Sequence, residues 1–464
     1  MTAADLTSRI APPPDTSCTF DRMSEGDRPA LRGWDAPEIE TILNARGEPL
    51  RVLNIHNIHA GPGGFEVFYE GTTEILRDNG HEVVTFERDN STIRTVGQKL
   101  RAFGSAIHSP TARDNVRALI EREQIDLVHL NNVWPLVSPS VITSCRQAFG
   151  GRGVPVVMSM QDYKLTCPAG QHLRSGQVCE KCLGGRELWC AIHGCRENHI
   201  WSAAYTVRNI VNRKRRIFRD GITLYLPCSQ FVADHLTKAG YDADRMHVLP
   251  DFTDLPEDVS FNCNDKPRNE YVAYVGRISP EKGLDVLIEA SRRTGIPVKI
   301  AGDPAKMPEL QRGTPPQVEF VGRLDRDELP DFYRKARFSV VPSTWYECFG
   351  IVAAEAQGYG TPVIASRIGG LPEVVQDGVT GLHVNPNDPA DLARAMTQLW
   401  EDPATVSGMC RAARRRAKEQ FAPDVFYRRI CAAYQRAIQL HQDDASDGNL
   451  LRGVSLPQRE AVHA

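Results

Sequence analysis

The sequence predicts an α/β protein with two doubly wound domains in tandem. Short apolar runs alternate with amphipathic helices in two successive series, a pattern typical of parallel sheets with crossover helices. A polar stretch without periodicity, at about 254–269, separates the two series and indicates an interdomain linker. Of the 464 residues, 41% are hydrophobic and 24% are charged, the balance of an ordinary globular protein.

The first series follows a Pro-rich, polar extension, 1–49, which we expect to be disordered or irregular. The N-terminal domain is predicted to span 50–255. A glycine-rich loop, 61–64, comes directly after its first strand, and a Cys-rich insertion at 165–200 interrupts the alternation. The expected strands are 51–56, 82–86, 127–130, 154–158 and 224–227, and the expected helices are 66–79, 112–123 and 229–238.

The second series is predicted to form a C-terminal domain, 271–422, after a linker at 256–270. A last long helix, 423–442, lies beyond the final strand, and we expect the tail, 443–464, to be disordered. Ligands of doubly wound sheets bind at the carboxyl ends of the strands, so a cleft between the two domains is the expected site. The expected strands are 271–275, 298–301, 318–321, 338–342, 362–366 and 381–384, with helices at 284–294, 351–357 and 390–400.

Charge and hydropathy narrow the function classes. The formal net charge of -3 gives no bulk electrostatic case for nucleic-acid binding. The first 20 residues lack the basic start and apolar core of a secretory signal. No apolar run approaches the roughly 18 residues that a spanning helix needs. We therefore expect a cytoplasmic protein, at most peripheral on the cytoplasmic face of a membrane.

The most informative segment is P-S-T-W-Y-E-C-F-G at 342–350, which contains one glutamate and is followed by another. Glu347 falls in a loop after a predicted strand, and Glu355 falls on the helix that follows. The amides of Phe349, Gly350 and Ile351 form the first turn of that helix, where free N–H groups and the helix dipole favour anions and hydroxyls. The alternative is that Glu347 caps the helix and Glu355 lies on a solvated face.

Two cations lie in the loop after the first strand of the second series, G-R-I-S-P-E-K-G at 276–283. Arg277 and Lys282 precede a helix N-terminus, so together they are suited to clamp a diphosphate. The alternative is an ordinary solvated loop that caps the helix with Ser279 and Pro280.

The spacing of Glu347 and Glu355 after Arg277 and Lys282 resembles family 4 of the retaining GT-B glycosyltransferases. Four other stretches match in order, and the resemblance covers about 50–440: G-H-E-V at 80–83, A-G-D at 301–303, G-G-L-P-E-V-V at 369–375 and D-G-V-T-G-L at 377–382. The resemblance implies the GT-B fold, in which two Rossmann-like domains face each other across a cleft and the final helix packs back on the N-terminal domain.

The resemblance also implies roles by position. Glu347 would hold the donor sugar, Glu355 the ribose, and Arg277 and Lys282 the diphosphate. No metal cofactor is expected for catalysis, because the two cations supply the charge that stabilises the leaving group. The remaining donor-binding positions are the amides of Phe349, Gly350 and Ile351, the backbone at Gly63 and Gly64, and Gln161.

Gln161 departs from the family pattern. Relatives commonly have His-Asp where this chain has Gln161-Asp162, after a predicted strand. Glutamine keeps hydrogen-bonding capacity but does not titrate near neutrality. The substitution leaves the identity of the donor sugar open.

Five cysteines lie between Cys167 and Cys195, spaced C-x11-C-x2-C-x7-C-x4-C. A C-x2-C pair with flanking cysteines predicts a tetrahedral thiolate zinc site in a reducing compartment. The expected ligands are Cys167, Cys179, Cys182 and Cys195, with Cys190 left over. The alternative is a set of free thiols.

A basic stretch, 208–219, interleaves arginines and a lysine with Ile210, Val211, Ile217 and Phe218. Such a helix is able to lie on anionic lipid, and the alternative is a solvated charged face.

The sequence thus predicts a retaining glycosyltransferase (a hexosyltransferase) that uses a nucleotide-diphosphate sugar. The acceptor would be a glycan, a lipid-linked molecule or a small molecule, with a role in polysaccharide or glycoconjugate synthesis. Two alternatives stay open: a nucleotide-sugar epimerase of the same fold, and a non-catalytic scaffold that binds sugar nucleotides.

Overall fold

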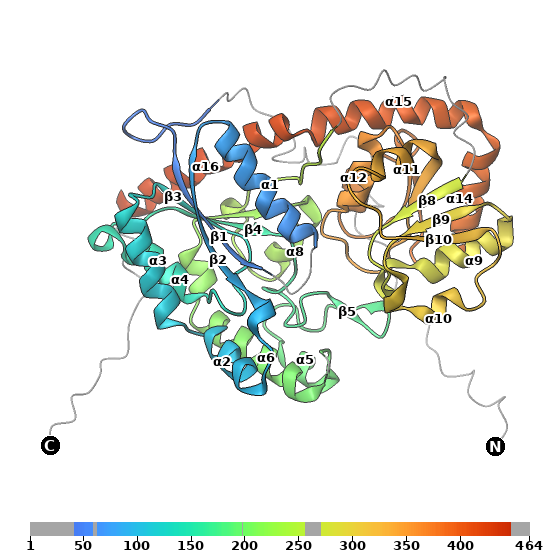
Figure 1. Ribbon diagram of the computed structural model, residues 1–464. Helices are drawn as coiled ribbons and strands as arrows, with labels where there is room; N and C mark the ends of the chain where they lie inside the picture. The colour runs from blue at the N-terminus through green and yellow to red at the C-terminus, as the bar shows by residue number, and fades with distance from the viewer. Residues whose placement is uncertain (1–40, 59–62, 197, 256–270, 447–464) are drawn as a thin grey trace, which may run out of the picture.

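The computed structural model describes residues 41–58, 63–196, 198–255 and 271–446. It contains two separate parallel sheets, one in each half of the chain, with helices packed around each (Figure 1). The predicted fold class is therefore confirmed. The predicted linker, 256–270, lies outside the described residues. Within the described part of the chain, no helix is both long and apolar enough to cross a bilayer.

The N-terminal sheet has the strand order β2-β1-β3-β4-β7, and all its pairs are parallel. Leu53 at its centre lies opposite Val84 on one side and Val128 on the other. Its strands are β1 (Arg51–Ile58), β2 (Glu82–Asp89), β3 (Leu127–Leu130), β4 (Val156–Met160) and β7 (Leu224–Pro227). Its helices are α1 (Gly64–Asp78), α2 (Val96–Ser105), α3 (Pro110–Arg122), α4 (Ser140–Gln147) and α8 (Gln230–Lys238).

The C-terminal sheet has the strand order β10-β9-β8-β11-β12-β13, also parallel throughout. Its strands are β8 (Tyr271–Val275), β9 (Val298–Ala301), β10 (Val318–Gly322), β11 (Ala336–Val341), β12 (Val363–Ser366) and β13 (Gly381–Val384). Its helices are α9 (Leu284–Thr294), α10 (Pro308–Gln311), α11 (Leu329–Lys335), α12 (Ile351–Gly358), α13 (Leu371–Val374), α14 (Pro389–Glu401) and α15 (Pro403–Gln420).

The last helix, α16 (Pro423–Ser446), crosses back to the N-terminal domain, as the family resemblance implies (Figure 1). Tyr434 donates or accepts a hydrogen bond with the buried His129 of β3 at 2.8 Å, and Tyr427 does the same with His81 at 3.0 Å. The helix continues to Ser446, so the prediction of a disordered tail from 443 on is wrong for its first four residues. Residues 447–464 lie outside the described part.

The described part of the predicted N-terminal extension, 41–49, packs against the N-terminal domain. Ile42 is buried in the same apolar cluster as α16, and Thr41 hydrogen-bonds to Tyr427 at 3.2 Å. This packing explains why the backbone of the last residues of the predicted extension, 41–49, has a defined conformation. Residues 1–40 lie outside the described part.

The Cys-rich insertion leaves the sheet after β4 and forms a small module of its own. A two-stranded antiparallel ribbon is followed by three helices. These elements are β5 (Leu173–Arg174), β6 (Gln177–Val178), α5 (Leu188–His193), α6 (His199–Lys214) and α7 (Ile217–Gly221).

The stretch 208–219 does not form the one continuous helix that was predicted, and its contact with lipid stays a hypothesis. The chain breaks between α6 and α7 at Arg216, which has a positive φ of 52°. Arg208 is buried and stacks 4.7 Å from the ring centroid of Trp134, while Phe218 is buried on the same side. Of the apolar side chains in this stretch, Phe218 is therefore part of the interior, whereas Ile210, Val211 and Ile217 are half-buried.

Candidate active site

The two domains touch where the predicted donor loop lies. Ser229, at the N-terminus of α8, donates a hydrogen bond to the carbonyl of Cys348 at 2.6 Å. The carboxylate of Glu373 in α13 accepts from the backbone amides of Gln230 and Phe231 at 2.7 and 2.8 Å. A carboxylate from one domain thus caps a helix of the other, a favourable charge arrangement at a helix N-terminus.

Glu347 lies buried in the loop between β11 and α12. Its Oε1 atom accepts hydrogen bonds from Lys282 Nζ and Ser343 Oγ, both at 2.6 Å. Burial alone would raise the pKa of this carboxyl group. The positive charge of Lys282 and the hydrogen bonds from Lys282 and Ser343 outweigh the effect of burial and hold the pKa below its ordinary value. Glu347 is therefore an ionised, oriented carboxylate, and the alternative of a simple helix cap does not account for these partners.

Two glycines allow the backbone around Glu347 to pack this closely. Gly369 has a φ of 62°, and a Cβ atom there would lie 2.3 Å from the carbonyl oxygen of Glu347. Gly283 has a φ of 66°, and a Cβ atom there would lie 2.0 Å from the carbonyl oxygen of Pro342. Any side chain at either position would displace the loop, which explains these two glycines of the G-G-L-P and E-K-G segments.

The two predicted diphosphate ligands occupy different surroundings. Lys282 ends a short 3-10 turn and its ammonium group is engaged with Glu347. Arg277 follows β8, its side chain is 58% exposed, and its nearest carboxylate is Glu281 at 3.5 Å. Arg277 is thus available for an anion, whereas Lys282 has to share its charge between Glu347 and any incoming phosphate.

Glu355 lies on α12, about one turn after the helix begins at Ile351. Burial, with a smaller contribution from Asp254, raises its pKa to about 7. The predicted amides precede it: Phe349 is buried, Gly350 has a φ of 100°, and Ile351 begins the helix. As the sequence predicts, Glu347 thus lies in the loop before α12, and Glu355 lies on that helix.

Gln161 lies directly after β4 and donates a hydrogen bond to Asp251 at 2.5 Å. Asp251 is buried, and burial raises its pKa to about 7 although the bond from Gln161 opposes the shift. The sequence analysis did not find Asp251, because 90 residues separate the two partners. Its one local signal is a lone aspartate that ends an apolar run, 248–250, just before the linker.

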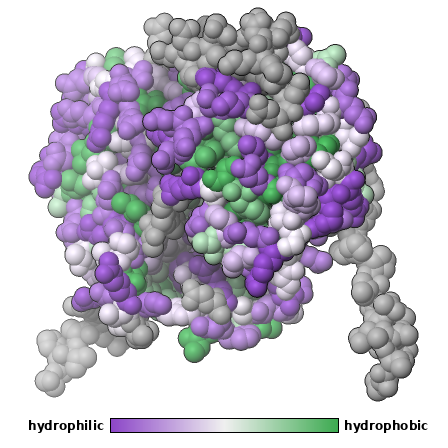
Figure 2. Space-filling model, turned by 45° about the vertical axis from the view of Figure 1, so that its right-hand side comes forward, coloured by the Kyte–Doolittle hydropathy of each residue, from purple (hydrophilic) through white to green (hydrophobic). Residues whose placement is uncertain are grey.

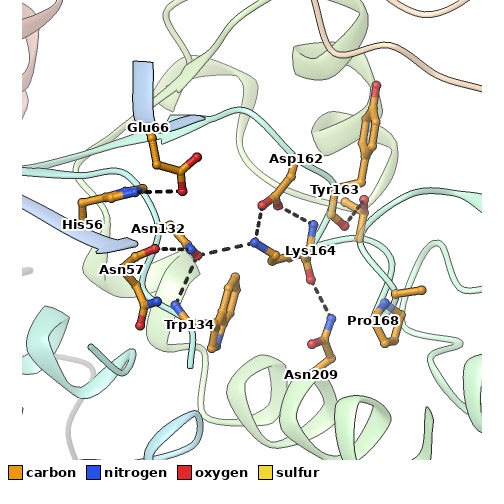
Figure 3. A network of polar contacts seen from close by, with 12 residues as sticks. His56, Asn57, Glu66, Asn132, Trp134, Asp162, Tyr163, Lys164, Pro168 and Asn209 are labelled. Atoms are coloured by element: carbon orange, nitrogen blue, oxygen red, sulfur yellow. Dashed lines mark hydrogen bonds and ion pairs between the residues drawn. The ribbon is translucent and has the colours of Figure 1, made fainter. Parts of the chain in front are cut away.

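A second polar cluster lies at the carboxyl ends of β1, β3 and β4 in the N-terminal domain (Figure 3). Lys164 forms an ion pair with Asp162 at 2.7 Å and reaches Asn132 at 3.5 Å. His56 lies 3.7 Å from Glu66 of α1. Gly63 and Gly64 open the same helix, and residues 59–62 of the predicted glycine-rich loop lie outside the described part. The sequence analysis did not predict this cluster.

The Cys-rich insertion touches the donor loop. Tyr346, next to Glu347, donates a hydrogen bond to Glu180 at 3.0 Å. Glu180 lies between Cys179 and Cys182, and His172 of the insertion contacts His235 of α8 at 3.0 Å between ring nitrogens. The insertion is therefore part of the surroundings of the candidate site.

The five cysteines of the insertion gather, but not as a preformed metal site. Burial and the neighbouring thiols raise the pKa of Cys190 to about 12, and its thiol hydrogen-bonds to Cys195. The same causes raise the pKa of Cys182 and Cys195. Cys190, predicted to stand apart from the zinc ligands, is thus a full member of the cluster. Among the described residues, no three Cys, His, Asp or Glu side chains are arranged to hold a metal ion.

Comparison with known families matches both halves of the chain. Residues 63–251 match the profile described as glycosyl transferase 4-like domain, and residues 257–420 match glycosyl transferases group 1. These two matches together take in well over half of the protein. The chain therefore belongs to the group 1 glycosyltransferase family, with a family-4-like N-terminal domain.

Curated relatives match over part of their length. The D-inositol 3-phosphate glycosyltransferase of Streptomyces avermitilis is 38% identical over 188 residues, covering 36% of this chain and 40% of that protein. The glycogen synthase of Mycobacterium tuberculosis is 41% identical over 162 residues, covering 32% of this chain and 38% of that protein. The chain thus spans less than half the length of these two relatives.

Solved structures share the whole two-domain architecture. The sucrose-phosphate synthase of Thermosynechococcus elongatus superposes with a TM-score of 0.61 at 20% identity, covering 86% of this chain and 100% of that one. The Anabaena protein HepE, solved in complex with UDP, gives a TM-score of 0.56 at 19% identity, covering 83% and 100%. These likenesses confirm the GT-B fold.

Proposed function

We propose that this protein is a retaining glycosyltransferase that moves a sugar from a nucleotide-diphosphate donor to a hydroxyl group of an acceptor. The observation that carries the proposal is Glu347, buried and ionised between Lys282 and Ser343. A carboxylate held in this way accepts hydrogen bonds from sugar hydroxyls and stabilises positive charge on the sugar ring. We place the reaction in the cytoplasm, in the synthesis of a polysaccharide or glycoconjugate.

The proposed reaction runs on one face of the sugar. The acceptor oxygen forms a bond to the anomeric carbon on the side from which the diphosphate departs. The bond from that carbon to the phosphate oxygen breaks with its electron pair, and the departing phosphate takes the acceptor proton. Arg277 and Lys282 stabilise the negative charge that develops on the leaving group.

The other residues bind and orient the donor in this proposal. Glu355 accepts hydrogen bonds from the ribose hydroxyls, and the first amides of α12 hold the sugar. Gln161, oriented by Asp251, presents its remaining amide groups to the sugar. Gly63 and Gly64 allow the backbone to approach the donor or acceptor, and the polar cluster around Lys164 receives the acceptor hydroxyls.

Uridine diphosphate sugars are the first donors to test, because a protein of the same fold has been solved with UDP. A ligand that binds only the folded state raises the melting temperature by mass action. We expect one sugar nucleotide of a panel to do so, and Glu355→Gln to weaken the shift while Glu347→Gln keeps it. Failure of every nucleotide to stabilise the protein would contradict the proposal.

A transfer assay separates the enzyme from the two alternatives. Inositol phosphates and glucans are the first acceptors to try, because the names of two curated relatives refer to such molecules. Conversion of the donor sugar without an acceptor would indicate an epimerase, and nucleotide binding without any turnover would indicate a scaffold.

We also propose that the Cys-rich insertion holds a structural zinc ion, supported by five thiols within 29 residues that act on one another's pKa. Binding would have to draw four of them together. Purified protein is expected to carry about one zinc per chain. Metal analysis of chelator-free protein that finds no zinc would contradict this, and Cys179→Ser with Cys182→Ser should remove the metal.

A further inference from the structure

Large apolar side chains are exposed together on the insertion. Among the described residues, eight large hydrophobic side chains are exposed, and five of them fall between residues 188 and 207. Ile200 is 79% exposed, Leu188 63% and Ile192 60%. Single exposed apolar residues are normal on a protein surface, but such a concentration marks an interaction site. The α5–α6 face consists of Leu188, Trp189, Ile192, Ile200 and Val207.

The two helices form one rigid support for this face. Thr206 of α6 donates a hydrogen bond to the carbonyl of Glu187 at 3.3 Å, and a ring nitrogen of His199 contacts the carbonyl of Ala191 at 3.1 Å. Cys190 and Ser202 are buried on the inner sides of the helices. The apolar side chains are therefore directed outward by helices whose other sides are fixed.

The charges around the face are almost all positive. Arg174, Lys181, Arg186 and Lys214 are exposed, and Lys181 lies 5.4 Å from the ring centroid of Trp189. The acidic groups of the described insertion are engaged elsewhere: Glu187 is buried against Arg213 at 2.6 Å, and Glu180 accepts from Tyr346. An apolar centre with a basic rim complements a surface that has an anionic outer layer over an apolar interior.

A small amphipathic cavity lies on another side of α6. It has a volume of about 170 Å³ between α2 and α6. Aromatic and cationic side chains line it together, among them Phe103, Trp201, Tyr205, Lys99, Arg196 and Arg208. Because successive helix residues are about 100° apart, Trp201 lies about 100° around α6 from Ile200, and Tyr205 lies about 160° from Val207, so the cavity is on another side of the helix than the exposed apolar line. The cavity suits a phosphate attached to an apolar chain.

We propose that the α5–α6 face docks on an anionic lipid bilayer. Trp and Lys at the rim favour the interfacial layer, and the isoleucines and leucine enter the acyl boundary. Helices α5 and α6 lie at the end of the N-terminal domain opposite α16, at the lower edge of Figure 1, and hydrophobic residues are visible at the lower edge of the surface in Figure 2. Docking there would bring a lipid-borne acceptor to the domain that carries the polar cluster around Lys164.

Vesicle flotation tests the docking independently of sugar transfer. We expect the full chain to float with phosphatidylcholine vesicles that contain about a third phosphatidylglycerol, and to be released when salt rises from about 0.1 M to about 0.5 M. Ile192→Asp combined with Ile200→Asp should reduce the bound fraction about tenfold, and so should Lys181→Glu combined with Arg186→Glu.

The matched control is Val379→Asp, a similarly exposed apolar residue of the C-terminal domain, which should float like the wild type. The thermal shift with UDP should stay unchanged in all variants, so loss of docking is distinguishable from failure of the proposed enzyme activity. Absence of flotation at low salt would overturn the proposal. So would a soluble dimer that the Ile192→Asp and Ile200→Asp pair dissociates while vesicle binding is unaffected.

Discussion

Lys282 and Glu347 form the most consequential residue pair of the candidate site. Both side chains are largely buried, so each charge depends on the other for its stability. The sequence analysis predicted that Lys282 clamps a diphosphate, with a solvated loop as the alternative. The structure shows that this cation already has a partner, Glu347. Donor phosphate would compete with Glu347 for the same ammonium group.

Alanine at the two cations should therefore give different results. Arg277→Ala should lower turnover by on the order of 10²-fold with little change in stability, because the side chain is 58% exposed. Lys282→Ala should lower turnover at least as much and also destabilise the fold by roughly 3 kcal/mol, because it leaves Glu347 buried without its cation. Turnover and thermal unfolding of both variants check this, and equal stability of the two would contradict it.

Asp251 provides a pH-dependent test. Its pKa is raised from about 3.8 to about 7, so the folded state retains a proton that the unfolded chain has already released. Stability therefore falls as pH rises between these values, and Glu355 acts in the same direction. Asp251→Asn should make the melting temperature fall less between about pH 5 and about pH 8.

The matched control for this measurement is Asp285→Asn, because Asp285 is exposed. This variant should keep the wild-type pH profile. An Asp251→Asn profile that parallels the wild type would show that Asp251 is not held protonated by its surroundings.

At the scale of elements, periodicity predicted the two sheets well. All eleven strands of the two sheets lie within a few residues of their expected places, because buried parallel strands are short apolar runs. The contacts between elements were not predictable. Gln161 with Asp251, and Tyr346 with Glu180, join residues 90 and 166 positions apart, and no local pattern records such pairs. Of the insertion helices, α5 and the first half of α6 were not predicted, whereas the predicted helix at 208–219 overlaps the end of α6 and α7.

The contact between the insertion and the donor loop predicts a positioning role for Glu180 and Tyr346. Tyr346→Phe removes one hydrogen bond but keeps the ring, so turnover should fall several-fold while nucleotide affinity stays unchanged. Glu180→Ala, which removes the acceptor of this hydrogen bond, should have the same pattern. Tyr427→Phe is the matched control, since it removes a hydroxyl bonded to His81 on the far side of the domain. Loss of nucleotide affinity in Tyr346→Phe would instead indicate general damage to the donor site.

At the scale of the whole molecule, the two domains meet through apolar packing as well as through polar contacts. One cluster of buried apolar side chains includes residues of both domains, and the rings of Phe231 and Tyr346 pack across the interface with centroids 4.8 Å apart. Glu373 caps α8 from across the interface, and Ser229 binds the carbonyl that follows Glu347. These contacts lie beside the donor loop. A change in the position of one domain relative to the other would therefore change the geometry of the site. The final helix joins the domains a second time, through its packing on the N-terminal sheet.

The configuration of the product tests the central claim, that Glu347 orients the sugar while the acceptor enters on the face that the diphosphate leaves. The measurement is proton NMR of the anomeric position early in the reaction, with the acceptor found in the transfer assay or with water as the acceptor. The account predicts the same anomeric configuration in the product as in the donor, and no sugar attached to the protein. An inverted product, or a glycosyl adduct on Glu347 detected by mass spectrometry, would contradict it.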